Sequence, residues 1–230
     1  MKKKLLIIGG SGFFGRSILN FIEKSKKYDG FFSNIYLTYR SEKIPISSGL
    51  KKKFKFTQFK GDISKIKKLP FAEYIIYCAL SKELSKDKLA IKNYIKLAKK
   101  FHKKSVLVYT SSGAVYGNQS KKIEKLSENN TINYQKQYSH YKKKYAKIKL
   151  ENEQNLSKLT KFNIKVIIAR CFAFVGRNIP LNDKYAIGNI INDIINRNNI
   201  KIRSKHRVIR SYMHTDDLSD ILLMLLKKQK

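Results

Sequence analysis

The feature that most constrains this chain is a repeated alternation of short apolar runs with longer, helix-patterned segments. Strands are predicted at 4–8, 34–38, 54–59, 74–80, 105–111 and 164–170, and helices from about residue 13, at 84–101 and at 139–160. Runs such as "KLLII" and "YIIYCAL" are apolar throughout, which is typical of strands buried on both faces. The alternation therefore predicts an α/β fold, a doubly wound parallel sheet with helices on both faces.

The first predicted strand ends in a glycine-rich turn, "GGSGFFG", in which Gly9, Gly12 and Gly15 follow a three-residue repeat. Such a turn lets the backbone approach a pyrophosphate, and the N-terminus of the following helix favours its negative charge. The alternative is an ordinary glycine turn between a strand and a helix. The turn alone indicates a dinucleotide site without establishing one.

Residues 137–153 read "QYSHYKKKYAKIKLENE" and contain two tyrosines that each precede a lysine by four positions. The pairs are Tyr138 with Lys142 and Tyr145 with Lys149, and at this spacing two helical side chains lie one above the other. An ammonium beside a phenol favours the phenolate, which makes the pair a proton donor and acceptor. The spacing does not choose between the pairs, and a solvated basic helix remains the plain alternative.

Five motifs occur in one order along the chain: "GGSGFFG", "GDI" at 61–63, "SSGAVYG" at 111–117, "YAKIKLENE" at 145–153 and "RSYMHTDDL" at 210–218. Together they resemble the extended short-chain dehydrogenases/reductases, and specifically the NAD(P)-dependent nucleotide-sugar epimerase/dehydratase family. The resemblance covers about residues 4–222 and implies a Rossmann fold. It divides the chain into a dinucleotide-binding domain, 1–170, and a substrate lobe, 171–230, with a helix that returns to the main domain.

The resemblance implies that Ser112, Tyr145 and Lys149 are the catalytic set. Ser112 would hydrogen-bond the reacting sugar hydroxyl, the phenol of Tyr145 would move its proton, and Lys149 would hold the nicotinamide ribose. The family pattern also favours Tyr145 over Tyr138, because a glutamate follows Lys149 by four residues. Ser139 is in addition a plausible N-cap, which would leave Tyr138 outside the helix.

The resemblance also implies a set of cofactor-binding positions. Besides Tyr145 and Lys149, these are Gly9, Gly12, Phe13, Phe14, Gly15, Arg40, Asp62, Ile63 and Ala79. Asp62 matches the position that reads the adenine. Arg40 ends the second strand where an acidic residue would bind the ribose of NAD, so it slightly favours the 2′-phosphate of NADP. Arg40 as a solvent-exposed charge, or stacked on the adenine, is the alternative.

For the substrate, the resemblance implies that Ser112, Asn189 and Arg210 contact a nucleotide-linked sugar, with Arg210 on the diphosphate. We interpret Thr215, Asp216 and Asp217 as the beginning of a helix with acids in its first turn. No metal site is predicted, and the four histidines show no metal-ligand spacing.

Three departures from the family pattern bear on the reaction. Family members that dehydrate the sugar use an Asp-Glu pair where this chain has Gly113 and Ala114. Ala173 replaces an asparagine that many relatives carry near the substrate phosphate. Relatives also usually continue for several tens of residues beyond the "DDL" helix, so we expect a shortened lobe and a sugar site that is incomplete, shared or reshaped.

The formal net charge is +34, from 50 basic and 16 acidic residues. The lysines are spread along the whole chain, which is typical of solvated surface and does not favour a nucleic-acid site. The N-terminus imitates a signal peptide but is interrupted by glycines, and no apolar run approaches the ~20 residues of a membrane span. Both cysteines lie in apolar runs, so we expect reduced thiols in a cytoplasmic protein. A homodimer is compatible with the sequence.

The sequence therefore predicts an NAD(P)-dependent epimerase or 4-keto reductase that acts on a nucleotide-linked sugar. A non-catalytic dinucleotide-binding protein of the same fold is the alternative, and a basic nucleic-acid-binding protein is a third, weaker one.

Overall fold

Six strands form one parallel sheet in a computed structural model that describes residues 2–81, 83–118, 125–137, 139–181, 185–202 and 210–228. The spatial order is β3-β2-β1-β4-β5-β6, so β1 and β4 are central. The strands are β1 (Lys3–Ile8), β2 (Phe32–Tyr39), β3 (Lys55–Lys60), β4 (Tyr74–Tyr77), β5 (Val106–Ser112) and β6 (Lys165–Cys171). The predicted doubly wound parallel sheet is confirmed.

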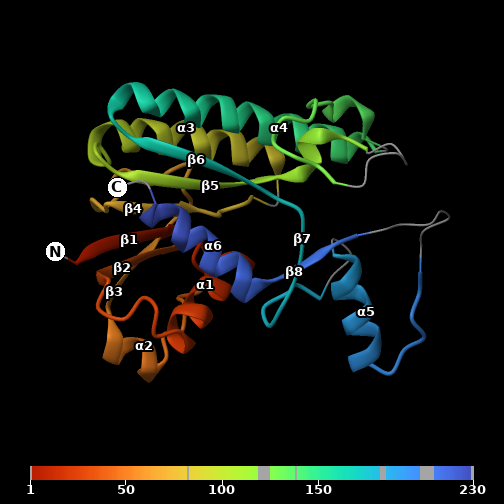
Figure 1. The fold of residues 1–230 in the computed structure, drawn as a ribbon, viewed down its shortest axis with the longest axis horizontal. Helices are drawn as coiled ribbons and strands as arrows, with labels where there is room; N and C mark the ends of the chain where they lie inside the picture. Colours follow the sequence, from red (N-terminus) through yellow and green to blue (C-terminus); the bar gives the residue numbers. More distant parts are fainter. Residues whose placement is uncertain are drawn as a thin grey trace.

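Helices cover both faces of this sheet (Figure 1). On one face lie α3 (Leu84–Phe101) and α4 (His140–Ser157), and on the other lie α1 (Phe13–Lys24), α2 (Ser48–Lys53) and α6 (Thr215–Lys227). A hydrophobic core lies on each face of the sheet, and alternate residues of β1 point into one or the other. Leu5 and Ile7 pack toward α1 and α6, and Leu6 and Ile8 pack toward α3 and α4. Apolar burial on both sides explains why the central strands read as unbroken apolar runs.

The predicted elements differ from the observed ones mainly at their ends. The strand expected at 74–80 ends at Tyr77, and the chain then passes beside the glycine turn, where the Cys78 N–H donates to the Ile8 carbonyl at 2.9 Å. The helix expected at 139–160 is α-helical from His140 to Ser157 and continues as a 3₁₀ turn, Lys158–Phe162. The short helix α2 was not predicted.

Beyond residue 171 the chain forms smaller elements at the carboxyl ends of the strands. Strands β7 (Ala173–Val175) and β8 (Tyr212–His214) pair in parallel, and α5 (Ala186–Ile195) lies apart from the main sheet (Figure 1). The domain boundary at residue 170 stays a prediction.

Helix α6 packs against α1, and its leucines fill the same core as those of the sheet. The Tyr28 hydroxyl donates to Asp220 Oδ1 at 2.7 Å, and Lys27 forms an ion pair with Asp220 at 2.7 Å. Asp216 and Asp217 occupy the first turn, and His214 is the N-cap, with its Nδ1 accepting from the Asp216 N–H at 3.2 Å. The interpretation of this segment as a helix beginning with acids in its first turn is confirmed.

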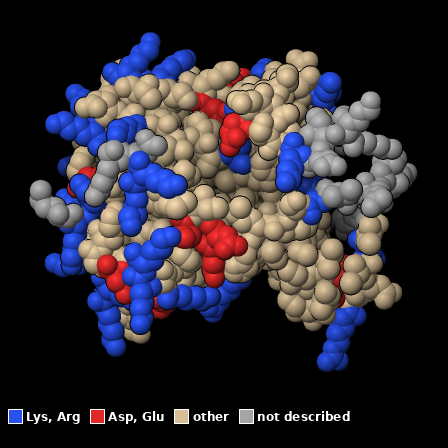
Figure 2. Space-filling view, in the orientation of Figure 1, with Lys and Arg blue, Asp and Glu red and all other residues tan. Residues whose placement is uncertain are grey.

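Basic side chains are spread over the upper and left-hand edges of the face in Figure 2 and extend to its lower right, with acidic side chains between them. Within the described ranges, no helix is both long and apolar enough to cross a bilayer.

Candidate active site

The glycine turn between β1 and α1 is shaped by close backbone approach. Gly9 has a φ of +95°, and a Cβ there would lie 2.6 Å from the Ala79 Cα. A Cβ on Gly15 would lie 2.5 Å from the Gly9 carbonyl oxygen. Gly12 caps α1 without a side-chain hydrogen bond. Helix α1 therefore begins against a bare backbone turn at the carboxyl end of β1, which is the geometry that suits a phosphate group.

Phe13 and Phe14 connect this turn to the C-terminal part of the chain. The Phe14 ring meets Phe174 of β7 edge-on, with 5.1 Å between centroids, and Phe13 meets Tyr185 at 6.1 Å. Tyr185 directly precedes α5. The aromatic contacts thus bring the beginning of α5 to the glycine turn.

Arg40 and Asp62 lie close together at the carboxyl ends of β2 and β3. The Ser64 N–H donates to Asp62 Oδ1 at 2.9 Å and is the main reason that the pKa of Asp62 lies below its usual range, with a smaller contribution from Arg40. Arg40 is exposed, and Ile63 is buried beside Asp62. These residues flank the edge of the sheet where the glycine turn lies, and no described contact joins them to Tyr145 or Lys149.

Lys149 is buried on the inner face of α4, with 4% of its surface exposed. Its Nζ donates to the Tyr109 hydroxyl at 3.2 Å and to the Thr110 carbonyl at 3.3 Å. It lies 4.9 Å from the Tyr109 ring centroid and 5.9 Å from that of Tyr145. Burial alone lowers the pKa of Lys149, but Tyr109, Tyr145 and Asp87 outweigh it and raise that pKa above the ordinary value. Lys149 is therefore an ammonium at neutral pH.

Tyr145 lies half-buried one turn before Lys149, and Ser112 ends β5. The Ser112 hydroxyl accepts from the Ala114 N–H at 3.2 Å and begins the 3₁₀ turn Gly113–Tyr116. Ser139 is the N-cap of α4, with its hydroxyl 3.2 Å from the Lys142 N–H. Tyr138 lies outside the described residues, but Lys142 is exposed whereas Lys149 is buried.

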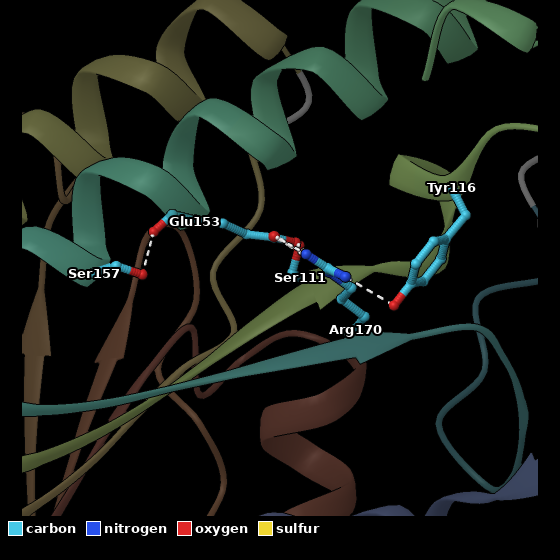
Figure 3. Close-up of polar contacts among 5 residues, drawn as sticks. All are labelled: Ser111, Tyr116, Glu153, Ser157 and Arg170. Carbon is cyan, nitrogen blue, oxygen red and sulfur yellow. Dashed lines mark hydrogen bonds and ion pairs between the residues drawn. The ribbon is translucent and has the colours of Figure 1, made fainter. Parts of the chain in front are cut away.

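A second, largely buried network holds these elements together (Figure 3). Arg170 of β6 donates from Nη2 to Glu153 Oε2 at 2.9 Å and from Nη1 to the Tyr116 hydroxyl at 2.7 Å. The Ser111 hydroxyl donates to Glu153 Oε1. Glu153, Arg170, Ser111 and Tyr116 thereby join α4, β6, β5 and the 3₁₀ turn, so the turn that follows Ser112 and the helix that carries Tyr145 are fixed in one register.

The predicted substrate residues lie in the smaller elements. Asn189 is half-buried in α5, and Arg210 is exposed before β8. No described contact links either residue to Ser112, Tyr145 or Lys149. Their assignment stays a prediction.

Sequence reasoning missed the partners of Lys149. Tyr109 lies in a strand that is buried along nearly its whole length, so no alternation marks which face it points to. Asp87 reads as an ordinary acid in the first turn of α3, and Asn152 carries no motif. The spacing from Lys149 to Asn152, three residues on a helix, is the one signal that could have suggested their proximity.

The comparisons with known proteins agree with this architecture. Residues 81–230 match the model of the NAD dependent epimerase/dehydratase family. A UDP-N-acetylglucosamine 4-epimerase from Methanobrevibacter ruminantium, in complex with UDP-N-acetylmuramic acid, superposes with a TM-score of 0.74 at 18% identity over 100% of this chain and 75% of that one. A dTDP-glucose 4,6-dehydratase from Bacillus anthracis, in complex with NAD, gives 0.72 at 18% identity over 99% and 72%.

A UDP-glucuronic acid 4-epimerase from Bacillus cereus, in complex with a fluorinated UDP-sugar and NAD, gives a TM-score of 0.70 at 16% identity over 99% of this chain and 74% of that one. No curated protein matches the sequence. The solved structures establish the fold, and the family match covers well over half of the chain. The resemblance seen in the five motifs is confirmed: the chain belongs to the NAD-dependent epimerase/dehydratase family.

Proposed function

We propose that this protein is an NAD(P)-dependent epimerase or 4-keto reductase that acts on a nucleotide-linked sugar. The observation that carries the proposal is the burial of Lys149 beside Tyr145. Its ammonium is held by a phenol and a carbonyl oxygen and forms no ion pair with a carboxylate of the described residues. A buried charge with no carboxylate in direct contact keeps capacity for another partner, which makes the position a candidate for function.

The residues present fit a dinucleotide. Gly9 and Gly15 leave backbone surface that any side chain would fill, at the beginning of α1. Asp62 and Arg40 stand at the neighbouring strand ends, where the adenosine half would lie. A bound nicotinamide supplies a hydride donor or acceptor. Lys149 would hold the ribose, and the exposed Arg40 would favour a 2′-phosphate, so we infer a slight preference for NADP.

In this proposal Tyr145 and Ser112 perform the proton transfer. The Ser112 hydroxyl would bind the sugar hydroxyl that reacts, and the Tyr145 hydroxyl would take its proton or return it. The ammonium of Lys149, 5.9 Å from the Tyr145 ring centroid, stabilises negative charge on the phenol oxygen. The network around Glu153 and Arg170 keeps α4 and β5 in register during these steps.

Residues 113 and 114 argue against a 4,6-dehydratase. Elimination of water requires an acid for the leaving hydroxyl and a base for the neighbouring carbon, and Gly113 and Ala114 supply neither. A Cβ on Gly113 would lie 2.4 Å from the Phe172 ring, so that ring occupies the space that a longer side chain would need. Epimerisation or reduction at C4 requires only one hydride carrier and one proton shuttle.

A non-catalytic dinucleotide-binding protein is the second candidate. It is favoured by the exposure of Arg210 and by the lack of any described contact between the predicted substrate residues and Ser112.

A ligand screen followed by a turnover assay distinguishes the two candidates. NAD, NADP and a panel of nucleotide sugars are tested for a rise in Tm, because a ligand that binds only the folded state stabilises it. Nucleotide hexoses are then incubated with the protein, and 4-keto sugars are incubated with NAD(P)H. We expect a stereoisomer or consumption of NAD(P)H. A 4-keto-6-deoxy product would refute the reaction class, and dinucleotide binding without turnover would support the non-catalytic candidate.

A further inference from the structure

A buried carboxylate, Asp87, lies between α3 and α4 on the face of the sheet that carries Lys149. It belongs to the first turn of α3, and only 2% of its surface is exposed. Its Oδ1 accepts from the Ser81 N–H at 3.2 Å, and its Oδ2 accepts from Asn152 Nδ2 at 3.2 Å. An acid that merely complements a helix dipole would remain in solvent, so this burial requires another explanation.

Hydrogen bonds lead from Asp87 to Lys149 without a break. Asn152 Nδ2 lies 3.4 Å from the Tyr109 hydroxyl, and Lys149 Nζ lies 3.2 Å from the same oxygen. The series runs from Asp87 through Asn152 and Tyr109 to Lys149, and every member is buried. Members of such a network fix one another's positions.

The charges of the two ends are complementary. Burial raises the pKa of Asp87 above its ordinary value, and the nearby Lys149 opposes part of that rise, while Asp87 contributes to the raised pKa of Lys149. Burial alone would neutralise both groups.

Other titratable groups also surround Lys149, on every element packed against it. They are Tyr145 on α4, Tyr109 on β5, Cys78 after β4, Cys171 in β6 and Tyr185 before α5. Tyr77 of β4 lies near Asp87. Burial raises the pKa of both thiols to about 12 and raises the pKa of Tyr77, Tyr109 and Tyr185. These five groups are neutral near pH 7, which leaves Asp87 as the carboxylate that balances Lys149.

We propose that Asp87 is a positioning residue for Lys149, which it orients through Asn152 and Tyr109 and holds in the charged form that contacts the cofactor. The part of this inference that concerns the cofactor rests on the proposed function of Lys149. The pairing of Asp87 with Lys149 does not.

A double-mutant cycle tests the pairing in the full chain without any ligand. Asp87→Asn, Lys149→Met and the double variant are compared with the unmodified protein by urea unfolding. We expect Asp87→Asn to raise the unfolding constant about tenfold or more when Lys149 is present, and to have little effect or to stabilise when residue 149 is Met. An equal effect in both backgrounds would overturn the proposal.

One further variant and one further comparison keep this experiment decisive. Glu83→Gln removes an exposed carboxylate just before α3 and serves as the control for a simple change in net charge. If Asp87→Asn does not fold, the proposal requires that Lys149→Met restores folding in the double variant. A double variant that is also unfolded would mean that Asp87 is purely structural.

NADH titrations at pH 6 to 10 test the link to the site. We expect Lys149→Met to raise the NADH Kd roughly tenfold or more at pH 7. For Asp87→Asn we expect near-normal binding at pH 6 and a rise in Kd toward pH 10, a range in which the unmodified protein should keep its affinity because the pKa of its Lys149 is raised. An unchanged pH profile, with Lys149→Met impaired, would overturn the role of Asp87 at the cofactor while the function stands. An unchanged Kd in Lys149→Met would instead refute the proposed function.

Discussion

Helix α4 buries two charges one turn apart and stabilises them in different ways. Glu153 meets Arg170 through both carboxylate oxygens and also accepts from Ser111 (Figure 3). Lys149 donates to a phenol and a carbonyl oxygen, and its carboxylate, Asp87, lies at the end of a relay. A charge such as Glu153, which is paired by direct contact with the opposite charge, has a structural role. A charge such as Lys149, whose counter-ion lies several residues away in the network, keeps hydrogen-bond donors for another molecule.

The largest expected effect is on chemistry beside Lys149. Tyr145→Phe removes only the phenolic proton, so we expect turnover to fall by about 10³-fold, within the range for a general acid-base group, with dinucleotide affinity nearly unchanged. Steady-state kinetics and a dinucleotide titration measure the two effects. Tyr141→Phe, on an exposed neighbour, is the control and should retain most activity. Loss of turnover in Tyr138→Phe, with Tyr145→Phe active, would reverse the assignment.

On the structural side of the comparison, Arg170→Met leaves Glu153 buried without its cation. We expect a loss of about 3 kcal/mol in the free energy of unfolding, measured in urea, because an uncompensated buried charge is strongly destabilising. Replacing both partners, with Glu153→Leu and Arg170→Met together, should recover most of that loss. A double variant as unstable as the sum of the single ones would show that the pair does not act as a unit.

Arg40 extends the comparison of the buried charges to an exposed one. If Arg40 binds the 2′-phosphate, Arg40→Ala should weaken NADP binding by ~1.5–3 kcal/mol and barely affect NAD. Calorimetric titration with both dinucleotides measures this difference. Lys142→Ala, at another exposed basic position, is the matched control. Small and equal effects on both cofactors would show that Arg40 is a bystander.

His102 provides a third case, a titratable group that is buried in its neutral form. Burial lowers its pKa to about 4, against the opposing effect of its hydrogen bond to the Pro70 carbonyl. Because the folded pKa lies below the unfolded value, its contribution to stability is present above about pH 6.5 and is lost as the pH falls toward 4. We expect the free energy of unfolding to fall by about 1 kcal/mol from this residue between pH 7.5 and 5.5.

Urea unfolding at both pH values measures this loss, with His102→Gln as the comparison. The Gln variant should lack that part of the pH dependence. An identical slope in both proteins would place the titrating group elsewhere.

The parts of the molecule that could be predicted from the sequence are those encoded by local pattern. The apolar runs gave the strand positions, and the glycine turn and the cap at Ser139 gave the beginnings of α1 and α4. Ile148 and Leu156, which helical periodicity places on one face with Lys149, are buried as Lys149 is. The relay from Asp87 to Asn152 could not be predicted, because it joins residues 65 positions apart through the packing of α3 on α4.

The contact of α6 with α1 has a consequence for how the protein is made. Asp220 bonds Tyr28 across 192 residues, and the leucines of α6 complete the core that the first strand begins. A ribosome must therefore synthesise the α6 segment before that core can close. Until then the nascent chain exposes the apolar face of α1 and one face of the central strands. Folding dominated by such distant contacts is slow, and the exposed surface is a natural binding site for chaperones during synthesis.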